Sequence, residues 1–469
     1  MNTNRIFALI NLAVFLDTVL YGLVVPVVPH YATVLGATPT GVGVIFAAYS
    51  AGLLLASVPA GLACDRYGYK PVMLLGMAGL TLSTLIFAFS GHIWLLAVSR
   101  LVQGVAGAAT WAAGLALVAF LYPPHLRGQK MGIVMTSTGA GTITGPLLGG
   151  ALYQFAGYSS PFLITALGGA LLTVLLWCNP LPGRPAATAP GSGRPACLPE
   201  LRKLLLQNRN LFWGVMITVV GSFGFGIIEP LLPLDLHRRL GLPSAGVGLL
   251  FAAFSLSYAL FQPLFGTISD RLGRKPLLVG GLVSTAATIP WLALAPDVKM
   301  ETAVMILLGA TTGAYSTPAL PMLAESVEQN GQPAAVKSTI NGCGHLKEGG
   351  QLDISPAAGD ANPAVPDARQ TGTGITRPVA DDKNRKRCAS TVYAADGENP
   401  ANGPYGTAFG LFNSAYSLGL VGGPLMGTFL AQRWGLPAVL LTYSILLLLT
   451  TAGVVAQLRE TLQGKSLRN

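Results

Sequence analysis

The sequence predicts an all-α membrane protein with twelve transmembrane helices in two pseudo-symmetric six-helix bundles. Three observations support this prediction: few charged residues, twelve apolar runs and an internal repeat. Of the 469 residues, 51% are hydrophobic and 10% are charged, whereas an average soluble protein carries about 25% charged residues. This composition excludes an ordinary soluble enzyme. Because no phosphate-binding loop or hydrolytic constellation is visible, we expect no enzymatic activity, no cofactor and no bound metal.

The apolar runs have the length that a membrane-spanning helix needs, which is about 20 residues. The first six cover 6–28, 42–62, 72–90, 93–118, 131–153 and 160–178, and the second six cover 210–233, 246–267, 276–295, 302–324, 405–430 and 436–456. The run at 6–28 is too long for a signal-peptide core and lacks a cleavage site. We therefore expect it to remain as the first span.

The basic residues predict the orientation of these spans. With the amino terminus inside, most of them fall in inner loops, as the positive-inside rule requires. The inner set is Arg66, Lys70, Arg127, Lys130, Arg184, Arg194, Arg202, Lys203, Arg209, Arg271, Arg274 and Lys275, and the outer loops hold Arg238, Arg239, Lys299 and Arg433. Both termini should be cytoplasmic. The net charge of +10 then indicates a lipid bilayer as the partner and excludes nucleic acid.

An internal repeat relates the two sets of spans. Residues 41–71 align without a gap on residues 246–276, with 14 identities in 31 positions. The match includes a polar loop, which chance similarity between apolar helices would not reproduce. Such parallel repeats are typical of alternating-access carriers, in which the substrate site lies at mid-membrane between two bundles.

Two polar segments interrupt the apolar pattern and divide the chain. We expect an N-terminal bundle at 1–180, a Pro/Gly-rich linker at 181–208, spans seven to ten at 209–326, a disordered cytoplasmic insertion at 327–403, and spans eleven and twelve with a tail at 404–469. The insertion is either a tolerated loop or gene-model artefact, or a regulatory segment with Ser and Thr sites. The five cysteines show neither pairing nor metal-ligand spacing.

The repeated polar loop carries the first motif. It reads Gly61-x-x-x-Asp65-Arg66-x-Gly68-x-Lys70-Pro71 in the first half and Gly266-x-x-x-Asp270-Arg271-x-Gly273-Arg274-Lys275-Pro276 in the second. Gly61 and Gly266 would let helices approach closely, and the two aspartates can pair with an arginine or cap a helix. We expect both loops to act as a conformational latch between the bundles. The motif resembles the signature loop of the major facilitator superfamily, and the resemblance implies that fold.

The fifth span carries a second motif that is rich in glycine. Its residues are Gly132, Gly141, Gly145, Pro146, Gly149 and Gly150, and the eleventh span echoes them with Gly419, Gly423, Pro424 and Gly427. So many glycines indicate a tight seam with neighbouring helices, and the proline permits a kink. The spacing resembles the antiporter motif of the drug:proton antiporter family, which implies exchange and not symport.

Three ionisable residues lie within the apolar runs, where charge is costly and usually functional. Asp17 lies 11 residues into the first run, which corresponds to a depth of about 16 Å. Arg100 lies in the fourth run, and Glu229 precedes Pro230 in the seventh. Each acid can bind an organic cation, carry a proton or form a salt bridge between helices. A carboxyl group that holds either a proton or a cation, and never both, would couple their movements.

Several short stretches resemble the vesicular monoamine transporter branch of that antiporter family. They include Phe15-Leu16-Asp17, the run at 25–29 (VPVVP) and the run at 228–233 (IEPLLP). The resemblance implies that Asp17 engages a protonated amine and that Glu229 is its acidic partner from the other bundle. Where the monoamine transporters carry acids in spans ten and eleven, this chain has Ser316 and Asn413, and Tyr49 replaces a lysine in span two. Asp17 and Glu229 would therefore carry more of the protons, or Asn413 would serve only as a polar contact to substrate.

The sequence thus predicts a monomeric, proton-coupled antiporter that exports amphipathic, cationic organic compounds from the cell. Its partners would be a small-molecule substrate and protons, and the cell membrane is favoured over an organelle membrane. Aromatic residues that can line the cavity by cation–π contact are Tyr21, Tyr49, Trp111, Phe225, Phe254, Tyr315 and Phe412. One alternative is a carrier of neutral or anionic metabolites, in which Arg100 would face the substrate. A second is a membrane sensor that transports nothing.

Overall fold

The computed structural model describes residues 3–179, 208–331 and 405–458. Most of the predicted linker and insertion lies outside these ranges, as do Arg184, Arg194, Arg202 and Lys203. Of the cysteines, Cys64 is buried and Cys178 is exposed, and both are free thiols. The boundaries of the predicted domains therefore stay predictions.

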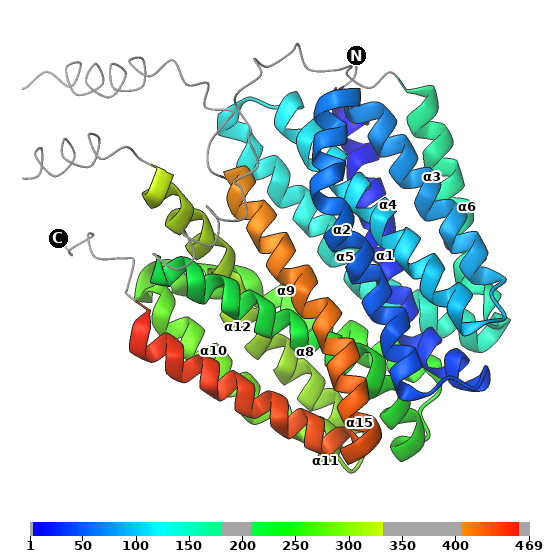
Figure 1. Cartoon of the computed structure of the whole chain (residues 1–469), viewed down its shortest axis with the longest axis vertical. Helices are drawn as coiled ribbons and strands as arrows, with labels where there is room; N and C mark the ends of the chain where they lie inside the picture. Colours follow the sequence, from blue (N-terminus) through cyan, green and yellow to red (C-terminus); the bar gives the residue numbers. More distant parts are fainter. Residues whose placement is uncertain (1–2, 180–207, 332–404, 459–469) are drawn as a thin grey trace, which may run out of the picture. The chain divides into compact units, whose positions relative to one another are not determined.

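Helices cover all twelve apolar runs, and α10 and α11 together cover the run at 276–295 (Figure 1). The first half of the protein contains α1 (Thr3–Val34), α2 (Pro39–Tyr67), α3 (Tyr69–Ala88), α4 (Ile93–Leu121), α5 (Pro124–Ala156) and α6 (Ser159–Cys178). The second half contains α8 (Arg209–Leu240), α9 (Ser244–Leu272), α10 (Arg274–Thr288), α11 (Trp291–Leu294), α12 (Val298–Gly331) and α15 (Tyr405–Gln457). The prediction of an all-α, multi-pass membrane protein is confirmed.

Within the described ranges, ten helices are long and apolar enough to cross a bilayer. Helix α5 is not among them, because its many glycines and threonines lower its hydropathy. Helix α15 counts once, although it contains two helices that meet at Gly435, where φ is 77°. With α5 and the second helix of α15, the structure accounts for the twelve predicted spans.

The repeated loop turns the chain in the same way in both halves. Gly68 separates α2 from α3 with φ 88° and ψ 165°, and Gly273 separates α9 from α10 with φ 96° and ψ 161°. Positive φ values of this kind favour glycine, because a side chain would clash with the backbone. The glycines of the motif therefore have a direct structural reason.

The lysines of the repeated loop cap the last helix of their own half. Lys70 donates a hydrogen bond of 3.0 Å to the carbonyl of Asn179, at the end of α6. Its repeat equivalent Lys275 donates one of 2.9 Å to the carbonyl of Leu458, at the end of α15. A cation at the C-terminal end of a helix satisfies free carbonyls and the helix dipole. The two halves thus reproduce the same local interaction.

Helix packing leaves an apolar surface for lipid. In the first half, α4 packs on α2 and α3, α1 on α5, and α3 on α6, while α8 and α10 pack on α15 in the second. Large apolar side chains remain open on the outside, such as Trp94 at 77% and Phe155 at 81% exposure. In water such exposure would be unfavourable, but hydrocarbon removes that cost.

The glycine motif of α5 forms a seam with α1 and α9. A Cβ atom at Gly145 would lie 2.8 Å from the carbonyl oxygen of Val19, and Pro146 Cδ would lie 2.9 Å from a Cβ at Gly22. The carbonyl of Pro146 in turn lies against Gly248 of α9, where no Cβ would fit. The predicted tight seam is therefore present, and it joins the first half to the second.

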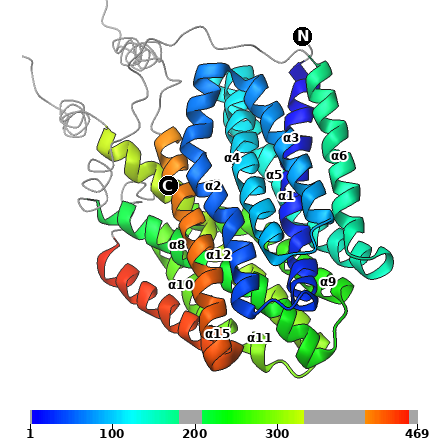
Figure 2. The ribbon, with the colours of Figure 1, turned by 45° about the vertical axis from the view of Figure 1, so that its right-hand side comes forward.

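An equivalent seam joins α15 to α8 and α2. Pro424 Cδ would lie 2.5 Å from a Cβ at Gly226, and the carbonyl of Pro424 would lie 2.6 Å from one at Gly43. Gly43 and Gly248 occupy the same position in the repeat. Figure 2 shows α2 and the first part of α15 side by side, as their contacts require. Both seams lie toward the end of the helices where α1 finishes and α2 begins, which we call the α1–α2 end.

Not every predicted close approach is present. A Cβ at Gly61 or at Gly132 would meet no heavy atom of the described residues within 4 Å, and one at Gly266 would meet only Thr317 at 3.9 Å. The prediction that Gly61 and Gly266 allow two helices to approach closely is therefore wrong for this structure, since both positions have room for a side chain. The remaining motif glycines that make close contacts are Gly141, Gly149, Gly150, Gly419, Gly423 and Gly427.

Candidate functional site

A cavity of about 530 Å³ lies among six helices: α1 and α5 of the first half and α8, α9, α12 and α15 of the second. Its volume falls within the range of small-molecule sites, about 300–1,000 Å³. Its lining runs from Val25 and Pro146, near the α1–α2 end, to Met135 and Pro321, which lie farther from that end. Glu229 is the one charged residue among the described residues that line it. The cavity thus presents a single carboxyl group.

Glu229 connects the two halves at the cavity wall. The side chain is 8% exposed, and its Oε2 accepts a hydrogen bond of 2.7 Å from the hydroxyl of Tyr21 in α1. Within the described residues, no basic side chain lies within the 4.0 Å that defines an ion pair with Glu229. A buried carboxylate without a paired cation is a costly arrangement. A proton or a cationic ligand would remove that cost.

Aromatic rings form much of the remaining wall. Of the predicted lining residues, Tyr21, Phe225, Phe254, Tyr315 and Phe412 line the cavity, whereas Tyr49 and Trp111 do not. The rings of Phe225 and Phe254 meet edge to face at 5.6 Å. The sequence analysis did not identify three further aromatic residues of the lining, which are Phe251, Tyr258 and Tyr416. This wall suits a ligand with an apolar body.

A polar corner lies on the α9 and α12 side of the cavity. The hydroxyl of Ser316, a predicted site residue, donates a hydrogen bond of 3.1 Å to the hydroxyl of Tyr258, and Gln262 also lines the cavity. The sequence analysis missed both Tyr258 and Gln262. The repeat contains a signal for them, because the equivalent residues in the first half are Leu53 and Ser57. Where equivalent positions of the two halves differ in this way, the polar residue has a role in only one half.

Asp17 lies behind the cavity wall and does not line the cavity. It is 2% exposed, and its Oδ2 accepts a hydrogen bond of 2.8 Å from Nε1 of Trp111. Its Oδ1 has no hydrogen-bond partner among the described residues. A Cβ at Gly107 would lie 3.2 Å from Oδ1 and 3.3 Å from the hydroxyl of Tyr49. Asp17 therefore occupies a narrow space within the first half.

Arg100 is enclosed by aromatic rings beside these two acids. It is 1% exposed, and its guanidinium carbon lies 4.5 Å from the ring centre of Tyr49 and 5.6 Å from that of Tyr21. Its Nη1 donates a hydrogen bond of 3.2 Å to Gln103. Within the described residues, Arg100 forms no ion pair with Asp17 or with Glu229. Cation–π contacts thus take the place of a salt bridge.

The remaining predicted site residues lie elsewhere. Asn413 of α15 is half-buried and does not line the cavity, whereas Tyr315 does. Four charged residues of the repeated loops, Asp65, Arg66, Asp270 and Arg271, are exposed and form no ion pairs within the described part of the chain, whereas Arg274 is buried, with 8% exposure. The latch that we expect between these loops therefore stays a prediction.

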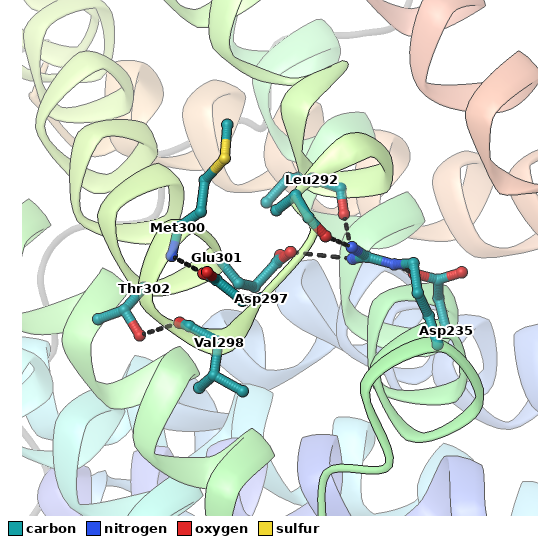
Figure 3. A network of polar contacts seen from close by, with 9 residues as sticks. Asp235, Leu292, Asp297, Val298, Met300, Glu301 and Thr302 are labelled. Atoms are coloured by element: carbon teal, nitrogen blue, oxygen red, sulfur yellow. Dashed lines mark hydrogen bonds and ion pairs between the residues drawn. The ribbon is translucent and has the colours of Figure 1, made fainter.

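The structure contains a buried acid that the sequence analysis missed. Glu301 at the start of α12 is fully buried, and its Oε2 lies 2.9 Å from Nη2 of Arg239 at the end of α8. Arg239 also pairs with Asp235 and donates hydrogen bonds to the carbonyls of Leu292 and Ala295 (Figure 3). The sequence analysis placed Arg239 in an outer loop. In the structure it lies at the end of α8 and binds the ends of two further helices. Glu301 is thus a structural acid, because its charge is already compensated.

A family model and curated relatives match this chain. The model for the Major Facilitator Superfamily matches residues 10–234 and 215–345. The chain is 30% identical to the chromaffin granule amine transporter of Rattus norvegicus over 292 residues, which is 61% of this chain and 54% of the relative. It is 26% identical to the synaptic vesicular amine transporter of the same species, covering 61% and 55%. The chain spans about half the length of these amine transporters.

A third relative matches over a larger share of its length. It is the MFS-type transporter SLC18B1 of Mus musculus, which is 30% identical over 66% of this chain and 69% of the relative. The resemblance to amine transporters that the motifs suggested is confirmed as a similarity. These relatives are transporters by name, which agrees with the prediction that the chain is not an enzyme.

Solved structures support the fold. The nucleoside transporter NupG superposes with a TM-score of 0.65 at 12% identity, over 98% of this chain and all of that one. A bacterial homologue of the human lysosomal transporter Spinster gives 0.64 at 14% identity, over 97% and 98%. At such low identity these likenesses concern the fold alone. Taken with the family model, the helices and the repeat, they establish that the chain belongs to the major facilitator superfamily.

Proposed function

We propose that the protein transports amphipathic organic cations across a membrane by alternating access, in exchange for protons. The observation that carries this proposal is the cavity, which combines one carboxyl group, Glu229, with a largely aromatic wall. The similarity to two amine transporters supports the same class of substrate. Drug or amine efflux from the cell remains part of the proposal, as do the cell membrane as its location and cytoplasmic termini.

The chemistry of the cavity favours a cation over an anion. A cation that enters can pair with Glu229 and lie against aromatic faces, which attract positive charge. An anion would meet the carboxylate of Glu229, and Arg100 lies behind the wall and not on it. The alternative of an anion carrier with Arg100 as its contact therefore lacks support.

We assign the substrate contact to Glu229 and a supporting role to Asp17. The sequence resemblance implied the reverse order, with Asp17 engaging the amine. Glu229 lines the cavity and Asp17 does not, which supports the change of roles. Proton exchange then follows if Glu229 holds either a proton or the substrate cation. Asp17 would set the electrostatic potential at Arg100 and Glu229, and would receive a proton in another state of the cycle.

The two proline–glycine seams support alternating access. They close the contact between the halves toward the α1–α2 end, while Asp65, Arg66, Asp270 and Arg271 at the other end form no ion pairs among the described residues. Opening the seams and closing the latch would expose the cavity to the opposite side. Gly43 and Gly248 occupy the same position in the repeat, and each contributes to one seam. The two halves can therefore move in equivalent ways.

Proteoliposomes with an imposed pH gradient test the proposal. With a more acidic interior, wild-type protein should accumulate a lipophilic amine against the concentration gradient of the amine, beyond the level in protein-free liposomes, and Glu229→Gln should abolish this excess. Asp297→Asn provides the matched control, because it neutralises an exposed carboxylate that caps α12 and asparagine caps equally well. If Glu229→Gln accumulates the amine as well as wild type, the proposal is wrong.

A further inference from the structure

Two histidines from opposite halves face each other near the α1–α2 end. His30 lies near the end of α1 and His237 near the end of α8, and their ring centres are 4.8 Å apart with the planes at 64°. His30 is half-buried and His237 is exposed. Neither residue lines the cavity, so the substrate site does not account for this pair.

The surroundings orient one ring for ligation. Nδ1 of His237 lies 3.1 Å from the carbonyl oxygen of Leu242. When Nδ1 carries the proton, it donates to that carbonyl and leaves the lone pair of Nε2 free. Most metal-binding histidines are held in this way, with the second ring nitrogen donating to a carbonyl or carboxylate. Neutral imidazole is a preferred ligand of zinc, copper and nickel ions.

The neighbouring charges permit a cation to bind between the rings. Arg239 points to Asp235 and Glu301, so its charge is largely compensated. Arg238 is exposed, so solvent and salt screen its charge. The ring of Tyr153 in α5 meets His30 edge on at 5.9 Å and closes one side.

We propose that His30 and His237 form an inhibitory site for a divalent transition metal such as Zn²⁺, which bridges α1 and α8. Within the described residues, no group of three or more His, Cys, Asp or Glu side chains can hold a metal. Water must therefore complete the coordination shell, as the exposure of His237 allows. Such an ion is a regulator and not a resident cofactor.

The expected consequence is inhibition of transport. An ion that binds only the closed arrangement of these helices stabilises that arrangement by a free energy that grows with the logarithm of its concentration over its Kd. If the halves must separate at this end during the cycle, the bridged protein cannot complete it. This consequence rests on the proposed transport function, whereas the binding of the metal does not.

Binding of Zn²⁺ to the purified protein tests the site itself. Isothermal titration should detect Zn²⁺ at micromolar concentrations, and Zn²⁺ should raise the midpoint of thermal unfolding. His30→Ala and His237→Ala should each weaken binding by more than about tenfold, because either change leaves one ligand. His92→Ala is the matched control, since His92 is an exposed histidine outside this pair. Equal Zn²⁺ affinity in wild type and both variants would overturn the proposal.

Transport assays then test the consequence. Micromolar Zn²⁺ on the side of the α1–α2 end should slow amine transport by wild type and by His92→Ala, and should leave His30→Ala and His237→Ala unaffected. If Zn²⁺ binds as expected but transport continues unchanged, the inhibitory bridge is refuted. If wild type transports no cation even without Zn²⁺, the proposed function fails while the binding measurements still decide whether the metal site exists.

Discussion

Asp17 and Glu229 are chemically similar acids in related first helices of the two halves, yet their surroundings differ. Both are buried, and each accepts one hydrogen bond from an aromatic side chain, Trp111 for Asp17 and Tyr21 for Glu229. The donor to Asp17 comes from its own half, whereas the donor to Glu229 comes from the opposite half. Only Glu229 meets the cavity. Depth in the membrane therefore does not decide which acid a substrate can reach.

The largest expected effect is that of Glu229→Gln on substrate binding. Removing one partner of a buried charge pair costs about 3–5 kcal/mol, so the affinity for a lipophilic amine should fall by about 100-fold or more. Equilibrium binding to detergent-purified protein measures this. If the affinity of Glu229→Gln stays within threefold of wild type, a difference of about 0.7 kcal/mol, the two acids do not differ in their contact with the substrate.

The Asp17→Asn variant tests the other side of the comparison. Because Asp17 does not line the cavity, its charge acts on the substrate only from a distance, and the affinity should change by less than about tenfold. Proton-driven accumulation should nevertheless be lost. The same binding assay, combined with uptake under a pH gradient, separates the two effects. A loss of affinity as large as that of Glu229→Gln would assign substrate contact to both acids.

The two hydrogen-bond donors provide a finer test. A hydrogen bond to a charged group contributes about 1.5–3 kcal/mol, so Tyr21→Phe should change amine affinity by roughly tenfold or more. Trp111→Phe removes the corresponding donor from Asp17 and should leave the affinity nearly unchanged. Both substitutions keep an aromatic ring, so the packing should be preserved. Equal effects on affinity would contradict the separate roles.

The smallest effect is expected where the two halves are alike. Lys70 and Lys275 cap the last helix of their respective halves with similar hydrogen bonds. Lys70→Ala and Lys275→Ala should therefore destabilise the protein equally, by about 0.3–1 kcal/mol each, without a change in amine affinity. Thermal unfolding at fixed detergent concentration measures this. Unequal losses would show that the asymmetry of the protein extends beyond the acid sites.

The elements of the fold could be predicted because each depends on local properties of the chain. Apolar runs of the right length specify the spans, and the repeat relates the seams, so Pro146 and Pro424 were recognisable as equivalent positions. The seams form because glycine permits backbone contact, which is also local information. The failed close approach at Gly61 shows the limit of that argument. A glycine permits contact, but a partner helix must be there to make it.

Sequence alone determined the helices, the twofold repeat and the three charges within the apolar runs, Asp17, Arg100 and Glu229, because hydrophobic length and residue spacing act along the chain. The tertiary structure decided which charge meets the cavity, that Tyr258 and Gln262 join it, and that Glu301 is compensated by Arg239. These outcomes depend on the rotation of each helix and on neighbours distant in sequence. Hydropathy tells how deep a residue lies, but the packing of six helices around one cavity decides which way its side chain faces.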